Sequence, residues 1–254
     1  MAGQIFAYIT HKEGKADDTA LELVKAAGKI FPDAPVTAIV TGAGADLDAV
    51  CNEVAASYKE VWKFDNQALT YPNAEAVRKL LVNALPQDAV VFCGHDTFGM
   101  DLAPGLAIKM DSVFLPDVVD FDGLDGDTIK VIRQEYSGQI STHVTGDISA
   151  GAVINIRPGA FQPDEAGSAG GQVVDKTSEA GDLAVGRQFL EVVAAEVGDV
   201  DITKEDVLVS VGRGIEDEDN LEIADELAEA IGAVVSCSRP TVSYTHLTLP
   251  TITE

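Results

Sequence analysis

The chain has 254 residues, of which 46% are hydrophobic, so it can form one large domain or two smaller ones with buried cores. Its 42 acidic and 17 basic side chains give a net charge of −25, which argues against binding to nucleic acid or to an anionic membrane surface. No apolar run approaches the roughly 18 residues that cross a bilayer, so we expect no membrane insertion.

The first 110 residues alternate between short β-rich apolar runs and segments with helical spacing of their apolar residues. Strands are expected at residues 3–10, 35–42, 60–64 and 88–94, and helices at 17–31, 46–56, 73–85 and 98–110. Asp46 is the expected N-cap of the second helix. This alternation predicts an α/β domain whose N-terminal, mostly parallel sheet carries helices on both faces.

The pattern changes at about Asp111. Strands are expected at residues 112–123, 127–138, 139–145 and 151–161, separated by Gly- and Asp-rich turns without helices. They predict an antiparallel or mixed extension of the sheet. Residues 165–172 have the composition of a flexible linker. A new strand at 207–212 restores the alternation, so we place a domain boundary near residue 200, with an N-terminal domain at 1–200.

Two segments of the N-terminal domain are weak candidate sites. TGAGADL at residues 41–47 resembles a dinucleotide fingerprint, but Leu47 stands where the third glycine belongs, so a plain strand-to-helix turn is favoured. His95, Asp96 and Asp101 follow a buried strand, where open α/β sheets bind ligands. His95 beside Asp96 could be an acid/base pair, but no nucleophile or metal motif accompanies them. We therefore predict no catalytic residue and no metal site.

A stronger candidate is the segment Gly212–Arg213–Gly214, between an expected strand and a helix that ends at Gly232. Helix N-termini attract phosphates, glycines let a ligand approach the backbone, and arginine adds a planar cationic fork. Acidic residues at 216–219 would compete with an anion, so a surface arginine in a turn remains the alternative.

The next expected strand, at residues 233–238, brings Ser238 and Arg239 to its end. If the two strands are parallel, both arginines lie along one edge of the sheet. This arrangement suits a ligand with several anionic or acceptor groups.

These segments resemble the α subunit of electron transfer flavoproteins. The resemblance covers residues 1 to about 241 and is carried by FGMDLAP, by VINIRPGAF at residues 153–161, and by the run from the GRG loop to SRP. It implies an N-terminal α/β domain, similar to adenine-nucleotide α-hydrolases, and the start of a second α/β domain that binds FAD.

The resemblance also implies a function and a partner. The protein would be an electron carrier rather than an enzyme, and would form a heterodimer with a β subunit that is expected to hold AMP. It would take electrons from dehydrogenases, such as the acyl-CoA dehydrogenases of fatty acid β-oxidation, and pass them to a quinone reductase or another acceptor. Gly212, Arg213, Gly214, Ser238 and Arg239 match the family's FAD contacts, and Arg213 would stabilise the anionic reduced flavin.

The sequence departs from the family after SRP, where TVSYTHLTLPTITE has no α/β period. We interpret residues 242–254 as a non-native tail and 201–241 as a truncated start of the FAD-binding domain, whose FAD site would then be incomplete. Two alternatives stay open for the whole chain. One is a nucleotide-dependent enzyme that uses the N-terminal sheet; the other is a cofactor-free module that docks a partner.

The three cysteines, Cys51, Cys93 and Cys237, are scattered and form no C-x-x-C motif. Their pattern is typical of a reducing compartment. Because no signal peptide is recognisable at the start of the chain either, we expect a cytoplasmic protein of a bacterium or an archaeon.

Overall fold

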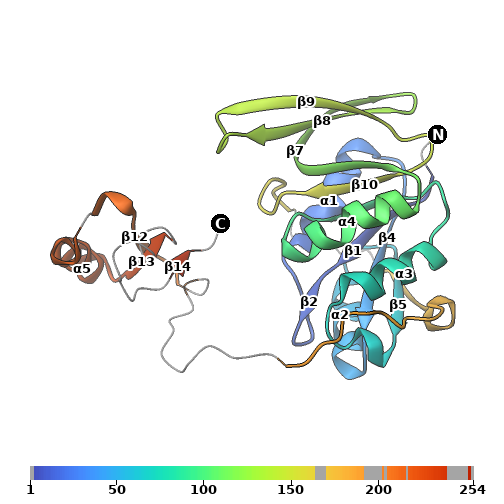
Figure 1. The fold of residues 1–254 in the computed structure, drawn as a ribbon, viewed down its shortest axis with the longest axis horizontal. Helices are drawn as coiled ribbons and strands as arrows, with labels where there is room; N and C mark the ends of the chain where they lie inside the picture. Colours follow the sequence, from blue (N-terminus) through green and yellow to red (C-terminus); the bar gives the residue numbers. More distant parts are fainter. Residues whose placement is uncertain are drawn as a thin grey trace. The chain divides into compact units, whose positions relative to one another are not determined.

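The structure is a computed structural model that describes residues 3–163, 170–191, 202, 205–215, 217–238 and 251–252. It divides into two compact units, Met1–Phe189 and Leu190–Glu254. Each unit has a β-sheet of its own (Figure 1).

The first unit is built on a nine-stranded sheet with the order β11-β5-β4-β1-β6-β10-β7-β8-β9. Its strands are β1 (Ile5–Ile9), β4 (Val36–Gly42), β5 (Glu60–Asp65), β6 (Val90–Gly94), β7 (Val113–Asp125), β8 (Thr128–Glu135), β9 (Ile140–Asp147), β10 (Ala152–Ile156) and β11 (Gln172–Asp175). The pairs β7–β8 and β8–β9 are antiparallel, and the remaining pairs are parallel. This confirms the predicted mostly parallel sheet and its mixed extension.

Helices cover both faces of this sheet. They are α1 (Thr19–Ile30), α2 (Ala45–Val54), α3 (Ala74–Ala84) and α4 (Thr97–Lys109). Alternate residues of a strand point to opposite faces, so Ile5 and Ala7 of β1 join the core under α1 and α2, while Phe6 and Tyr8 join the core under α3 and α4. Figure 1 shows α3 and α4 together on one face. Because both faces are covered, β1, β6 and β10 are buried along their whole length.

We call the antiparallel strands β7, β8 and β9 the arm. β7 pairs in parallel with β10 through its first half and antiparallel with β8 through its second half. The change of partner comes near Asp117, where the register against β10 is irregular and Asp117 takes a left-handed φ of 57°. A non-glycine residue in this conformation is uncommon and marks a backbone that its surroundings hold in place.

Several short features differ from the predictions. A hairpin of β2 (His11–Lys12) and β3 (Lys15–Ala16) is too short to show a period in the sequence. β11 adds a parallel strand beside β5 and begins at Gln172, the last residue of the segment predicted to be a linker. Gly171 passes so close to the backbone there that a Cβ would lie 1.8 Å from the carbonyl oxygen of Tyr58. The glycine that suggested flexibility is therefore required by a close approach.

The N-cap predicted for the second helix was wrong. α2 begins at Ala45, and its N-cap is Gly44 at φ 76° and ψ −155°, with no side-chain cap. This backbone conformation is accessible essentially only to glycine, so the turn is fixed by Gly44. Asp46 lies inside the first turn, where its charge still complements the helix dipole.

The second unit contains a small parallel sheet of β12 (Leu208–Val211), β13 (Val234–Ser238) and β14 (Thr251–Ile252), in that order, and helix α5 (Leu221–Ile231). β14 belongs to the segment 242–254 that the sequence analysis set apart, and its two residues pair with β13. α5 ends at Gly232 with a left-handed φ of 67°, as predicted. Of the apolar residues of α5, Ala224 and Ala228 are buried, while Leu227 and Ile231 are each 51% exposed.

Candidate cofactor-binding site

The register of the second sheet brings two predicted site segments together. Val211 at the end of β12 is paired with Cys237 of β13, and the two strands run in parallel. Gly212–Arg213–Gly214 and Ser238 therefore follow the carboxyl ends of neighbouring strands, the edge at which open α/β sheets bind ligands. Arg239 lies outside the described residues.

The loop after β12 turns tightly. Arg213–Ile215 form a short 3₁₀ turn (η4), closed by a hydrogen bond of 3.1 Å from the backbone N of Ile215 to the carbonyl oxygen of Gly212. Gly212 and Gly214 do not have a positive φ, and a Cβ added to either would meet no atom within 4 Å. Neither backbone conformation nor packing in the described residues requires glycine here. The loop thus presents bare backbone to open space, which permits a ligand to approach closely.

The helix is not where the sequence placed it. A second 3₁₀ turn, Glu218–Asn220 (η5), separates the loop from α5, which begins at Leu221. Asn220 holds this connection through hydrogen bonds from its side-chain Nδ2 to the carbonyl oxygen of Ile215 at 2.8 Å and from its backbone N to that of Asp217 at 3.2 Å. Aspartate and asparagine favour such turns over a helix interior.

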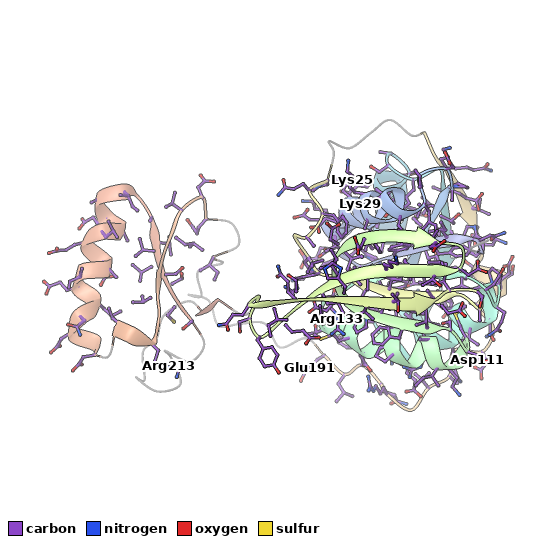
Figure 2. The ribbon with its side chains drawn as sticks, turned by 90° about the horizontal axis from the view of Figure 1, so that it is seen from above. Lys25, Lys29, Asp111, Arg133, Glu191 and Arg213 are labelled. Carbon is purple, nitrogen blue, oxygen red and sulfur yellow. The ribbon has the colours of Figure 1, made fainter. Side chains whose placement is uncertain are left out.

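The offset of α5 changes the electrostatic interpretation of the loop. α5 begins seven residues after Gly214, so the N-terminal N–H groups of this helix are not part of the loop. The positively charged group of the loop is the side chain of Arg213. Arg213 is exposed and extends from the loop at this end of the strands (Figure 2). A planar guanidinium, bare glycine backbone and the partly buried hydroxyl of Ser238 fit a ligand with several acceptor groups, such as a flavin nucleotide.

The glycine turn of the first unit is structural. Gly42 packs against the ring of His11, and a Cβ at this position would lie 3.2 Å from the Nε2 of His11, so a larger residue would require the ring to move. Gly44 provides the backbone conformation at which α2 begins. Leu47, at the position of the missing third glycine, is fully buried in the core. The favoured interpretation as a plain strand-to-helix turn therefore agrees with the structure.

His95, Asp96 and Asp101 do not form a common site. Asp96 is the N-cap of α4 and accepts a hydrogen bond from the backbone N of Gly99 at 2.6 Å. Asp101 forms an ion pair with Arg187. His95 faces Asp117, at 3.9 Å between Nε2 and Oδ1, and not its neighbour Asp96. The three side chains thus have separate partners.

A polar cluster that the sequence analysis missed lies around Asp117. The Nε and Nη2 of Arg157 donate to its two carboxylate oxygens at 2.8 and 2.6 Å. Burial raises the pKa of Asp117, but the hydrogen bonds from Arg157 and the charges of Arg157, His95 and Arg133 outweigh it, so the pKa is lowered overall. Asp117 lies on β7 and Arg133 on β8, whereas His95 directly follows β6 and Arg157 directly follows β10. No sequence spacing could therefore have revealed the cluster.

Among the described residues there is no group of three or more potential metal ligands. No helix in the described part of the chain is long and apolar enough to cross a membrane.

The two units define an α/β protein with an arginine-bearing loop at the carboxyl edge of its second sheet, an arrangement suited to a nucleotide-type cofactor. Residues 5–182 match the electron transfer flavoprotein domain, and residues 201–249 match the electron transfer flavoprotein FAD-binding domain. The chain belongs to the electron transfer flavoprotein family, as an α subunit.

Individual relatives agree with this assignment. The chain is 28% identical to an electron transfer flavoprotein subunit alpha of Methylophilus methylotrophus, over 93% of this chain and 74% of the relative. It is 27% identical to that of Bacillus subtilis, over 90% and 70%. It is also 25% identical to a lactate dehydrogenase (NAD(+),ferredoxin) subunit of Acetobacterium woodii, over 93% and 57%. These matches favour the electron carrier over the two alternatives that the sequence left open.

Proposed function

We propose that this chain carries electrons between other enzymes as the α subunit of a heterodimer and catalyses no reaction of its own. Its FAD contacts are Gly212, Arg213, Gly214, Ser238 and Arg239. FAD supplies the redox chemistry when it is bound. The observation that carries the proposal is the pairing of Val211 with Cys237, which puts the arginine loop and Ser238 at one sheet edge within the matched FAD-binding domain.

The proposed FAD contacts contribute different chemical groups. The open backbone at Gly212 and Gly214 lets the cofactor lie against the loop. Arg213 supplies a fixed positive charge that favours the more negative, reduced state of its ligand. Ser238 offers a hydroxyl at the neighbouring strand end. The chain thus influences the reduction potential of the flavin through the charge of Arg213 and the positions of these groups.

The proposed partners are those of the electron transfer flavoprotein family. The β subunit, with AMP bound, completes the heterodimer in our proposal. Dehydrogenases, including those acting on acyl-CoA in fatty acid β-oxidation, are the proposed donors, and a quinone reductase or another acceptor receives the electrons. We place this exchange in the cytoplasm of a bacterium or archaeon.

Co-expression with the β subunit tests the proposal. We expect the two chains to purify together as a yellow complex with flavin absorbance, and the absorbance to fall when Arg213 and Ser238 are both replaced by alanine. A stable, colourless monomer from the same co-expression would contradict the proposal.

A further inference from the structure

The first unit contains a cavity of about 810 Å³ beside α1, which we call the α1 cavity. Its lining comes mainly from one side of α1, from Val119 and Asp120 of β7, and from the turn that follows β10. Cavities of roughly 300–1,000 Å³ with a largely apolar lining are typical of small-molecule sites. The α1 cavity is thus large enough for a small organic ligand.

Gly28 leaves one wall of this cavity open. It lies inside α1, two residues before the helix ends at Ile30, where glycine is less favourable than alanine by about 1 kcal/mol. A Cβ added to Gly28 would meet no atom within 4 Å, and its φ is not positive. Neither packing nor backbone conformation in the described residues requires glycine here. The bare helix backbone allows a flat group to lie directly against it.

The walls of the cavity are held in place by contacts between α1 and the two segments that face it. The Oε1 and Oε2 of Glu22 accept hydrogen bonds from the backbone N of Gly159, at 3.0 and 2.8 Å, which tie the turn after β10 to α1. Lys29 forms an ion pair with Asp120, which ties β7 to the same helix. A cavity whose walls are already fixed costs little to order when a ligand binds.

Apolar side chains line the cavity on each of these three sides. They are Leu21 and Val24 of α1, Val119 of β7, and Ala160 and Phe161 of the turn after β10. All except Phe161 are only partly buried. An apolar group in the cavity would therefore remove further apolar surface from water, which favours binding.

The charged groups of the lining are two ammonium groups and one carboxylate. Lys25 and Lys29 lie one turn apart on α1 (Figure 2), and Asp120 is the carboxylate. The Nζ of Lys29 lies 5.9 Å from the centre of the Phe161 ring, so a cation borders the apolar wall. The lining thus carries one more positive than negative group, in a chain whose net charge is −25. A negatively charged group is attracted to this border of the cavity.

We propose that the α1 cavity binds a small aromatic carboxylate, with its ring over Gly28 and its carboxylate beside Lys25 and Lys29. An inorganic anion would meet the lysines but would leave the apolar walls in water. A neutral apolar molecule would cover the walls but would gain nothing from the lysines. An aromatic carboxylate satisfies both parts of the lining. The site belongs to the first unit alone and shares no residue with the proposed FAD contacts.

Calorimetric titration of the full chain with 2-naphthoate, and with its uncharged amide 2-naphthamide, tests the proposal. We expect one naphthoate to bind per chain, and the amide to bind roughly threefold more weakly or worse, because it lacks the charge that the lysines attract. Absence of naphthoate binding below about 1 mM would overturn the inference. Equal affinity for the two compounds would overturn it as well.

Gly28→Leu tests the place of binding, because its side chain projects into the open part of the cavity. The affinity for naphthoate should fall about tenfold or more, since the leucine occupies the space of the ring. The melting temperature should equal or exceed that of wild type, because leucine is the better helix former. Gly28→Ala fills less of the cavity and should weaken binding less. Unchanged affinity of a folded Gly28→Leu variant would place the ligand elsewhere and overturn the inference.

Replacement of both Lys25 and Lys29 by glutamine tests the charge and also decides the matter if Gly28→Leu fails to fold. The affinity for naphthoate should fall roughly threefold or more, and that for naphthamide should stay within about twofold of wild type. Lys109→Gln is the matched control, since it removes an exposed lysine from the last turn of α4 and should leave both affinities unchanged. Unchanged binding of naphthoate by the double variant, or an equal loss for both compounds, would overturn the inference.

Discussion

Arg213 contributes the positive charge of the loop that follows β12. The loop that carries it has bare glycine backbone on both sides, and the helix that follows begins only at Leu221. Its positive charge therefore acts without the help of a helix N-terminus. Because Arg213 is exposed, water screens its charge, and its influence on a ligand depends on how far the bound ligand and partner exclude that water.

Replacement of Arg213 by alanine should lower the flavin potential of the assembled heterodimer and leave the fold intact. A charge at close range contributes roughly 1–4 kcal/mol, depending on solvent screening, which for one electron corresponds to about 40–170 mV. The exposure of the side chain places the expected shift at the lower end of this range. Arg213→Lys should restore part of it, because the charge returns without the planar fork.

Spectroelectrochemical titration of both variants beside wild type measures this shift. Circular dichroism of the same samples serves as the control for folding. Equal potentials within error, together with unchanged FAD content, would mean that Arg213 is a structural turn residue.

The sequence allows these candidate residues to be predicted more readily than their surroundings. Glycines, an arginine and a serine at the ends of apolar runs can be recognised one at a time, and the parallel pairing of Val211 with Cys237 then brings them together. The cluster around Asp117 could not be recognised. Its members lie on or directly after four strands whose order in the sheet does not follow the order of the chain, so only the fold reveals their proximity.

At the scale of elements, the predicted helices and strands of the first 160 residues are present because their apolar periods are long and regular. The apolar periods do not predict the order of the strands in the sheet. β10 lies between β6 and β7, although it comes after the whole arm in the chain. Two-residue strands such as β2 and β3 carry no detectable period, and β11 follows a glycine-rich segment whose composition resembles a linker.

Two glycines allow a paired test of how backbone conformation determines these elements. Gly44→Ala should lower the free energy of unfolding by about 1–3 kcal/mol, because φ 76° and ψ −155° strain any residue with a Cβ. Gly28→Ala should raise it by about 0.5–1 kcal/mol, because Gly28 lies inside α1 and alanine is the better helix former. A Cβ at either position meets no atom within 4 Å, so neither result is confused by a clash.

Urea denaturation of both variants measures the two free energies, and the slope against urea should stay that of wild type. Stabilisation by Gly44→Ala would show that the α2 turn relaxes into another conformation. Destabilisation by Gly28→Ala would show that the Cβ meets something outside the described residues.

At the scale of the whole molecule, the two units differ in how much core they contain. The cores of the first unit fill both faces of its sheet and draw on residues from Ile5 to Leu183. In the described part of the second unit, the core cluster consists of Val211, Ala224 and Cys237, with four partly buried neighbours. A core this small supplies little stability, so we infer that the units unfold separately and that the second is the weaker.

Deletion of residues 242–254 should therefore leave the unfolding of the first unit unchanged. In the described residues of this segment, Thr251 and Ile252 pair with β13 of the second unit, and the cores of the first unit contain none of its residues. Trp62, the single tryptophan of the chain, packs against Phe6 with ring centroids 4.9 Å apart. Its fluorescence thus follows the first unit alone.

The Trp62 transition of the deletion variant should coincide with that of wild type during thermal unfolding. Leu80→Ala is the positive control, since it removes a fully buried side chain of α3 and should cost about 2–5 kcal/mol. A destabilisation of about 1 kcal/mol would lower the midpoint by roughly 2–4 °C for a domain of this size. A shift of that size on deletion would show that the last thirteen residues pack against the first unit and that the two units are not independent.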